Sequence, residues 1–329
     1  EDLQRGYEQL ERGGAVAFGA KTSSYQQWAA QLLKEAESAE TKKEAAYWLA
    51  RGESRRLPRD YEAGENSVAS TSSVQVSLSA AETKALLQEV PGVYHTQIND
   101  ALLTAVGIAL TEWTGGERVV VELEGHGREE VGGGVDVTRT VGWFTSIYPV
   151  ELEVERDKGI GERLKAVKES LRGVPRHGLG YGLLRYLSSD AEVRRELRER
   201  AAAEVSFNYL GQFEYFGDGT REATTPDGWS AAPESSGMDQ SPQSERTHLL
   251  EIGGNVAGGR LKMVWSYSRA VHRRETIHAV ADRFVHALRE LIAHCQSPEA
   301  GGYTPSDFPL APINQEQLDK LFATVESKS

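Results

Sequence analysis

Apolar residues recur at helical spacing in the first 50 residues of the chain. The spacing predicts amphipathic helices over 3–10 and 25–32, and the second helix follows the capping candidates Thr22 and Ser23. Nothing upstream caps the first helix or covers its apolar face, so we expect the chain to begin inside a larger domain. Residues 52–68 (GESRRLPRDYEAGENSV) are charged, contain Pro58 and lack periodicity, which is typical of a linker.

From residue 68 onward, strand and helix periods alternate. A capping box, Ser79-x-x-Glu82, predicts a short helix, and the valine run in RVVVELEG (118–125) is typical of a strand covered on both faces. Further strands are expected at 74–78, 146–154 and 204–213 and as a hairpin of 248–252 with 261–267, and further helices at 96–113, 160–171 and 277–292. Residues 216–246 are rich in Gly, Ser and Pro and predict a long loop. Together these elements predict an α/β fold of the α+β sandwich kind.

The composition narrows the class of protein. With 39% hydrophobic and 26% charged residues the chain is typical of a globular domain, and its net charge of −12 argues against a nucleic-acid partner. No apolar run is long enough to span a membrane and no signal peptide is evident, so we expect a cytoplasmic protein. The single cysteine, Cys295, lies in an apolar helical pattern and is expected to be a buried structural thiol. The eight histidines are scattered without metal-ligand spacing, so no metal is expected.

The most informative short string is EGHGRE, residues 124–129. It lies where the valine-rich strand ends, and strand ends commonly carry functional side chains. A carboxylate emerging from an apolar strand would be partly desolvated and more basic, as a general base for a weakly acidic C–H needs to be. Taken on its own, the string also fits a surface turn with solvated charges.

Several longer strings occur together and in a fixed order. EGHGRE resembles a core motif of the epimerization domains of nonribosomal peptide synthetases, and RTVGWFTSIYPV (139–150), PRHGLGYG (175–182) and FNYLGQ (207–212) resemble the motifs that follow it. The strings SPQSERTHLLEI and GGYTPSDFPLA (301–311) are similar to the C-terminal end of the same family. The resemblance implies two lobes similar to chloramphenicol acetyltransferase with a tunnel between them. Residues 1–67 would be a helical remnant of the N-terminal lobe with its linker, and 68–329 the C-terminal lobe.

The resemblance also implies a reaction. The family inverts the α-carbon of an aminoacyl or peptidyl residue held as a thioester on the phosphopantetheine arm of a peptidyl carrier protein. The thioester carbonyl acidifies the α-proton, so no cofactor of the domain's own is expected. Neighbouring synthetase domains are the other expected partners.

Site residues are carried over from the matching motifs. Glu124 corresponds to the family's catalytic glutamate, and Asn208 and Tyr209 match residues that line the site. Tyr209 is expected near the enolate as a hydrogen-bond donor or alternate proton source, although a tyrosine anchoring a sheet edge fits equally well. The remaining candidates for substrate binding are His126 and Arg128, which fit holding the turn better, and Trp143 and Phe144, which fit core packing better than walling the tunnel.

One family signature is missing from the sequence. The family carries His-His-x-x-x-Asp-Gly in its N-terminal lobe, whereas these 329 residues contain no His-His pair. Inversion removes a proton from one face of the α-carbon and delivers one to the other, and a single fixed carboxylate reaches one face only. We therefore expect the chain to begin just downstream of the signature and not to epimerize by itself.

Two alternatives share most of these features. A condensation domain, or a dual condensation and epimerization domain, uses the same scaffold to form peptide bonds. A noncatalytic interaction module of a synthetase would also retain the fold, and it would be indifferent to substitution of Glu124.

Overall fold

The computed structural model describes residues 2–50, 52, 55–213, 234, 237, 239–311 and 313–326. The chain forms two compact units, each assembled from separate segments. Unit 1 comprises Glu1–Leu49, Gly125–Ser146 and Arg176–Glu199, and unit 2 comprises Ala50–Glu124, Ile147–Pro175 and Arg200–Ser329. The predicted boundary at residue 67 refers to lobes of a larger domain and stays a prediction.

Unit 2 is built around a six-stranded sheet with the strand order β1-β6-β5-β4-β2-β3. The strands are β1 (Thr71–Ser77), β2 (Arg118–Gly125), β3 (Ser146–Glu153), β4 (Val205–Phe213), β5 (Leu250–Ala257) and β6 (Arg260–Ser268). β4 runs parallel to both β2 and β5, while β6 is antiparallel to β5 and to β1. The predicted hairpin is thus confirmed, and the fold is mixed α/β as expected.

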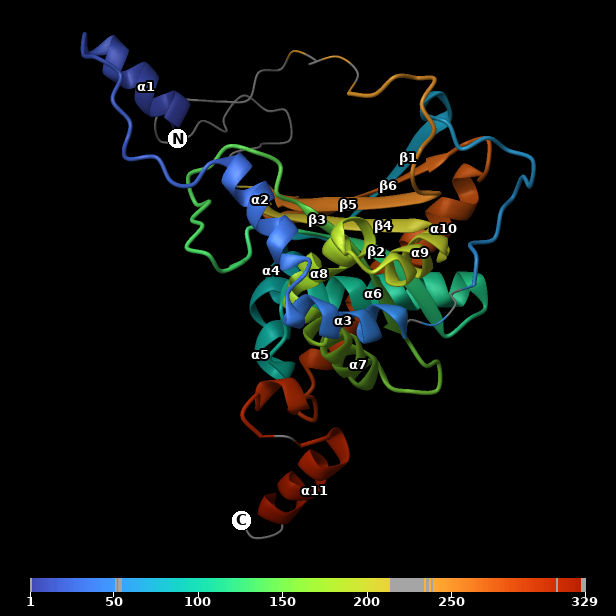
Figure 1. Cartoon of the computed structure of the whole chain (residues 1–329). Helices are drawn as coiled ribbons and strands as arrows, with labels where there is room; N and C mark the ends of the chain where they lie inside the picture. Colours follow the sequence, from blue (N-terminus) through green and yellow to red (C-terminus); the bar gives the residue numbers. More distant parts are fainter. Residues whose placement is uncertain are drawn as a thin grey trace. The chain divides into compact units, whose positions relative to one another are not determined.

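Helices cover one face of this sheet (Figure 1). The helices of unit 2 are α4 (Ala80–Gln88), α5 (Val90–Tyr94), α6 (Ile98–Thr114), α7 (Ile160–Arg172), α10 (Arg274–Cys295) and α11 (Gln315–Glu326), with the 3₁₀ turns η1 (Val68–Ser70) and η4 (Pro305–Asp307). The predicted box at α4 is confirmed, because Ser79 and Glu82 cap each other reciprocally. In α6 every residue from Asp100 to Thr111 is buried. Helix and sheet approach closely at Gly107, where a β-carbon would lie 2.7 Å from the Val154 side chain.

Alternation along the strands gives the sheet two different faces. Side chains that point towards the helices are buried and apolar: Val74, Val121, Leu123, Val205, Phe207, Leu250, Ile252, Met263, Trp265 and Tyr267. Their neighbours in sequence are mostly polar, for example Ser206, Asn208, Glu251 and Ser266. We call these the apolar face and the polar face. The two-sided covering predicted for β2 applies only to its first half, because exposure on the polar face rises from Val120 through Glu122 to Glu124.

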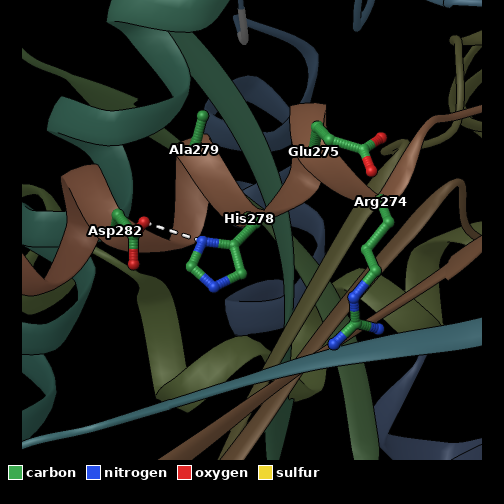
Figure 2. Close-up of a pocket in the computed structure, with 5 residues that line it drawn as sticks. All are labelled: Arg274, Glu275, His278, Ala279 and Asp282. Carbon is green, nitrogen blue, oxygen red and sulfur yellow. Dashed lines mark hydrogen bonds and ion pairs between the residues drawn. The ribbon is translucent and has the colours of Figure 1, made fainter.

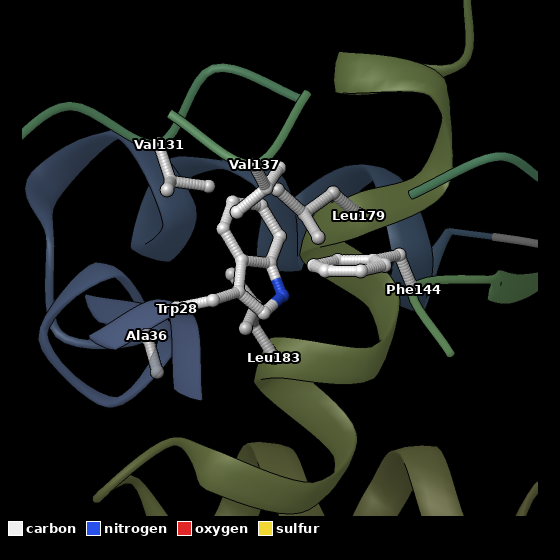
Figure 3. Close-up of a cluster of buried hydrophobic side chains, with 7 residues drawn as sticks. All are labelled: Trp28, Ala36, Val131, Val137, Phe144, Leu179 and Leu183. Carbon is white, nitrogen blue, oxygen red and sulfur yellow. The ribbon is translucent and has the colours of Figure 1, made fainter. Parts of the chain in front are cut away.

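Unit 1 contains helices around a small core of its own. Its elements are α1 (Asp2–Glu11), α2 (Tyr25–Glu35), α3 (Ala39–Leu49), η2 (Pro175–Gly178), α8 (Leu179–Gly182), the π-helical turn η3 (Leu183–Leu187) and α9 (Ala191–Glu199). Figure 3 shows the indole of Trp28 surrounded by the side chains of Val131, Val137, Phe144, Leu179 and Leu183. The apolar face of α1, with Leu3, Tyr7 and Leu10, is exposed.

Several local predictions need correction. The N-cap of α2 is Ser24, which forms a capping box with Gln27, so Thr22 and Ser23 lie two residues and one residue too early. Segment 52–68 is not a free linker where it is described: Leu57 is buried, and the backbone N–H groups of Asp60 and Tyr61 donate to Val271 O. Most of the predicted loop 216–246 lies outside the described residues. Among the described helices, none is long and apolar enough to cross a membrane.

Candidate active site

Glu124 and Asn208 meet at the end of two parallel strands of unit 2. The register pairs Leu123 with Phe207, so the next residue of each strand points to the polar face at the same height. Asn208 Nδ2 donates a hydrogen bond of 2.8 Å to Glu124 Oε2. The amide thus fixes one carboxylate oxygen and leaves the second available to a proton.

The expected desolvation of Glu124 is wrong for the chain as it stands. The Glu124 side chain is exposed, and Asn208 is half-buried. The reason is the position of Glu124, on the polar face at the second-last residue of β2, where no apolar strand neighbour covers it. The site therefore has defined geometry without a dry environment.

Tyr209 is not brought together with this pair. It follows Asn208 in a regular stretch of β4, paired with Gly254, so alternation places it on the opposite face. Its hydroxyl is buried and has no hydrogen-bond partner among the described residues. Burial raises the pKa of Tyr209, so the phenol stays protonated at neutral pH as a donor without an acceptor.

Several polar pairs lie elsewhere on the polar face. His248 Nε2 lies 2.6 Å from Glu122 Oε2, two residues before Glu124. Arg246 Nη2 lies 3.1 Å from Glu251 Oε2, and Arg118 pairs with both Glu151 and Glu153. The sequence predictions missed the Glu122–His248 pair. The alternation in RVVVELEG places Glu122 and Glu124 on one face, but no local signal points to His248.

In unit 1, His126 and Arg128 hold the loop that follows β2, as expected for a turn-holding role. Arg128 N donates to His126 Nδ1 at 3.0 Å, and the Arg128 guanidinium donates to the carbonyls of Val137 and Thr140. The guanidinium also lies 4.0 Å from the centroid of the Phe144 ring. All of these partners of the Arg128 side chain belong to unit 1.

Glu129, the last residue of the EGHGRE string, bridges two histidines. Its two oxygens lie 3.2 Å from His126 Nε2 and 3.2 Å from His177 Nδ1. His177 and Arg176 both have left-handed backbone conformations, with φ of 47° and 41°. The Arg176 side chain is anchored by Glu35, Glu44 and Thr41. The Arg176 contacts therefore fix the PRHG segment (Pro175–Gly178) against α2 and α3.

Trp143 and Phe144 differ sharply. Phe144 is 8% exposed and packs edge-on against Trp28 and Tyr25, so the prediction of core packing is confirmed for it. Trp143 is 78% exposed, and the same prediction is wrong there. The Phe144 side chain points into the core, whereas the Trp143 side chain points to solvent. The backbone carbonyl of Trp143 accepts a hydrogen bond from the Tyr25 hydroxyl.

A surface hollow on α10 is a poorer candidate for an active site than the Glu124–Asn208 pair. Figure 2 shows Arg274, Glu275, His278, Ala279 and Asp282 along one side of this helix. The only bond drawn joins His278 Nδ1 to Asp282 Oδ2 at 2.7 Å, one helical turn apart. Because the residues come from a single helix, they do not converge on one point. No group of three metal-ligating side chains occurs among the described residues, and burial raises the pKa of Cys295 to about 11, which keeps that thiol protonated.

Comparisons with known proteins agree with this architecture. The sequence matches the condensation domain family over residues 1–310, and the chain therefore belongs to that family. It is 50% identical over 324 residues to one of the linear gramicidin synthase proteins of Brevibacillus parabrevis, covering 97% of this chain and 4% of the relative. It is 39% identical over 327 residues to surfactin synthase subunit 1 of Bacillus subtilis, covering 98% of this chain and 9% of the relative. The chain thus spans a small part of the curated relatives.

Two solved structures show the same fold at different levels of sequence identity. The epimerization domain from the third module of tyrocidine synthetase B superposes with a TM-score of 0.79 at 38% identity, covering 89% of this chain and 64% of that domain. The starter condensation domain of rhizomide synthetase superposes with a TM-score of 0.58 at 16% identity, covering 90% of this chain and 62% of that domain, which shows the fold alone. The chain is a condensation-family domain of the kind found in nonribosomal peptide synthetases.

Proposed function

We propose that the chain belongs to an epimerization domain, which inverts the α-carbon of an aminoacyl or peptidyl thioester. The substrate would be carried on the phosphopantetheine arm of a peptidyl carrier protein, beside neighbouring synthetase domains. The observation that carries this proposal is the Glu124–Asn208 pair, a carboxylate held by one oxygen at a strand end. The EGHGRE string and the 38% identity to a tyrocidine epimerization domain support it.

The chemistry assigned to Glu124 is proton transfer. The free carboxylate oxygen takes the α-proton, and the electron pair of the broken C–H bond delocalises onto the thioester oxygen as an enolate. A proton delivered to the same face restores the starting isomer, and a proton delivered to the opposite face gives the inverted product. Asn208 is a positioning residue that keeps the second oxygen of Glu124 in place.

Solvent exchange separates removal of the α-proton from inversion. The substrate is an aminoacyl carrier protein in D₂O, and the readouts are deuterium at the α-carbon and the chirality of the released amino acid. The assay uses the 329-residue chain and the same chain joined to the upstream part of the tyrocidine epimerization domain. We expect Glu124→Gln to lower the rate of α-deuterium exchange at least ~100-fold, because loss of one general base typically lowers a rate by about 10²- to 10⁴-fold.

The control variant is Glu117→Gln, which changes an exposed carboxylate just before the same strand. Exchange in this variant should equal that of the parent chain. Unchanged exchange in Glu124→Gln would refute the proposed role, and it is also the result that a noncatalytic interaction module predicts.

A second candidate function is peptide-bond formation, which the match to the condensation domain family favours. It requires a second, acceptor aminoacyl carrier protein. Formation of an amide product without inversion or α-deuterium would select this function over the first.

A further inference from the structure

Glu122 and His248 form a defined carboxylate–imidazole pair in unit 2. The Nε2–Oε2 distance is 2.6 Å, and the side chains are 22% and 12% exposed. A carboxylate accepts only, so His248 Nε2 carries the hydrogen and donates it. The pair is anchored at its far end by Asn66, whose Nδ2 donates to His248 O at 2.9 Å.

The pair stands beside Glu124 on the same surface. Glu122 and Glu124 are two residues apart in β2, so both side chains point to the polar face with their β-carbons about 7 Å apart. The neighbouring strand β4 contributes the neutral side chains Ser206 and Asn208 at these heights. Two carboxylates therefore lie side by side, one bound to an amide and the other to an imidazole.

Several other charged groups of the polar face are engaged in pairs, and Lys262 of β6 also lies on this face. On the β3 side, Arg118 binds Glu151 and Glu153; on the β5 side, Arg246 binds Glu251; and at the start of β4, Glu204 accepts from the Leu57 N–H. Among the described residues of this face, His248 is the basic side chain that binds Glu122 directly. The net charge of the pair beside Glu124 is therefore set by Glu122 and His248 together.

We propose that the Glu122–His248 pair sets the charge felt by Glu124 and thereby the pH at which Glu124 works. When His248 is neutral, Glu122 leaves a net negative charge beside Glu124, which favours proton uptake by Glu124. When His248 is protonated, the imidazolium cancels that charge. The proposal rests on the proposed function, and Glu122 and His248 act in it as positioning residues.

The test uses two substitutions with opposite expected signs. Glu122→Gln removes the negative neighbour, and His248→Gln leaves it uncompensated. Against the parent chain, the acid midpoint of the pH–rate profile for α-deuterium exchange should move to lower pH in Glu122→Gln and to higher pH in His248→Gln. Two partly solvated charges two residues apart on one strand face predict shifts of roughly 0.5 to 1 pH unit. The double variant should return close to the parent midpoint.

His278→Gln is the matched control. His278 also pairs with a carboxylate at 2.7 Å, but it lies on α10, which packs against the apolar side of the sheet. Its midpoint should equal that of the parent chain. Retention of the parent melting temperature in each variant separates a charge effect from unfolding.

A second readout does not need turnover. In chains labelled with ¹³C at the glutamate carboxyl groups, the Glu124 resonance is identified by its loss in Glu124→Gln, and its titration midpoint is followed in the other variants. Opposite shifts of this midpoint without any exchange would leave the pair standing and remove the proposed function. Absent shifts, or shifts of the same sign, would overturn the pair whether or not exchange occurs.

One further outcome overturns the proposal. If His248→Gln abolishes exchange and added imidazole restores it, His248 transfers a proton itself and is not a charge-setting neighbour. The expected result is instead a change of about two- to threefold in the plateau rate, with no rescue, because a modest change in basicity has a modest effect on a general base.

Discussion

The two faces of the sheet in unit 2 differ in what holds their side chains. On the apolar face, Phe207, Trp265 and Tyr267 are almost completely buried and are positioned by packing against helices. On the polar face, Asn208, Glu122 and Glu124 are positioned by directional bonds to single partners. Phe207 and Asn208 are consecutive residues, so one strand serves both purposes.

The two faces therefore contribute differently to the free energy of folding. Burial of apolar area dominates the free energy of folding, whereas exposed polar pairs contribute little to it. The polar face can therefore change its residues at small cost in stability, provided that the apolar face is intact.

The largest effect is expected from breaking the apolar face. Phe207→Ala should lower the free energy of unfolding by about 3–5 kcal/mol, because it removes a buried aromatic ring and leaves a cavity. Asn208→Ala, its sequence neighbour, should cost less than about 1 kcal/mol. Urea unfolding of both variants checks this, and similar losses in the two would contradict the comparison.

A smaller loss is expected from a buried ion pair away from both faces. Lys168 is 1% exposed, and its Nζ lies 2.7 Å from Asp307 Oδ1 and 2.9 Å from Tyr94 O. Lys168→Ala should cost about 3 kcal/mol, because it leaves the largely buried carboxylate of Asp307 without its cationic partner. Glu122→Gln keeps an oxygen that accepts from His248 Nε2, so it should cost about 1 kcal/mol in the same unfolding assay. An equal cost for the two would show that the polar face is not the weakly stabilising one.

The smallest effect concerns the cap of α4. Hydrogen bonds with Ser79, and then with Arg289, lower the pKa of Glu82 to about 2. A lowered pKa contributes stability that is complete above the ordinary value of 4.5 and is lost as the pH falls from there towards 2. Glu82→Gln keeps a capping side chain without the charge, and its cost should stay below about 1 kcal/mol because the side chain is partly solvated. Thermal unfolding at pH 7 and pH 2 checks it: the difference between parent and variant should vanish at the lower pH.

Periodicity predicted most of the regular elements. The apolar run of α6, the box at Ser79 and the hairpin of β5 and β6 are local signals, and each appears at the expected place. α11 was missed although Leu318, Leu321 and Phe322 recur at helical spacing in it. Trp143 was predicted to be buried because its residue type favours burial, but the loop exposes it.

The site was predicted only in part, because its residues are far apart in the sequence and local patterns do not show which strands pair. The end of a valine-rich strand marked Glu124, and the resemblance added Asn208 and Tyr209. Periodicity alone could not say that β4 pairs with β2, so the bond between Asn208 and Glu124 had no local signal. Once the register is known, alternation separates Asn208 from Tyr209. The Glu122–His248 pair joins residues 126 positions apart and was missed for the same reason.

The parallel pairing of β2 with β4 also sets the order of events during synthesis. Glu124 and Asn208 are 84 positions apart, so a growing polypeptide cannot form their bond until β4 has left the ribosome and docked. His248 emerges later still. Glu122 and Glu124 therefore have no partner until the later segments have been translated. A pause in translation between these segments would prolong the time for which the edge of β2 is unpaired.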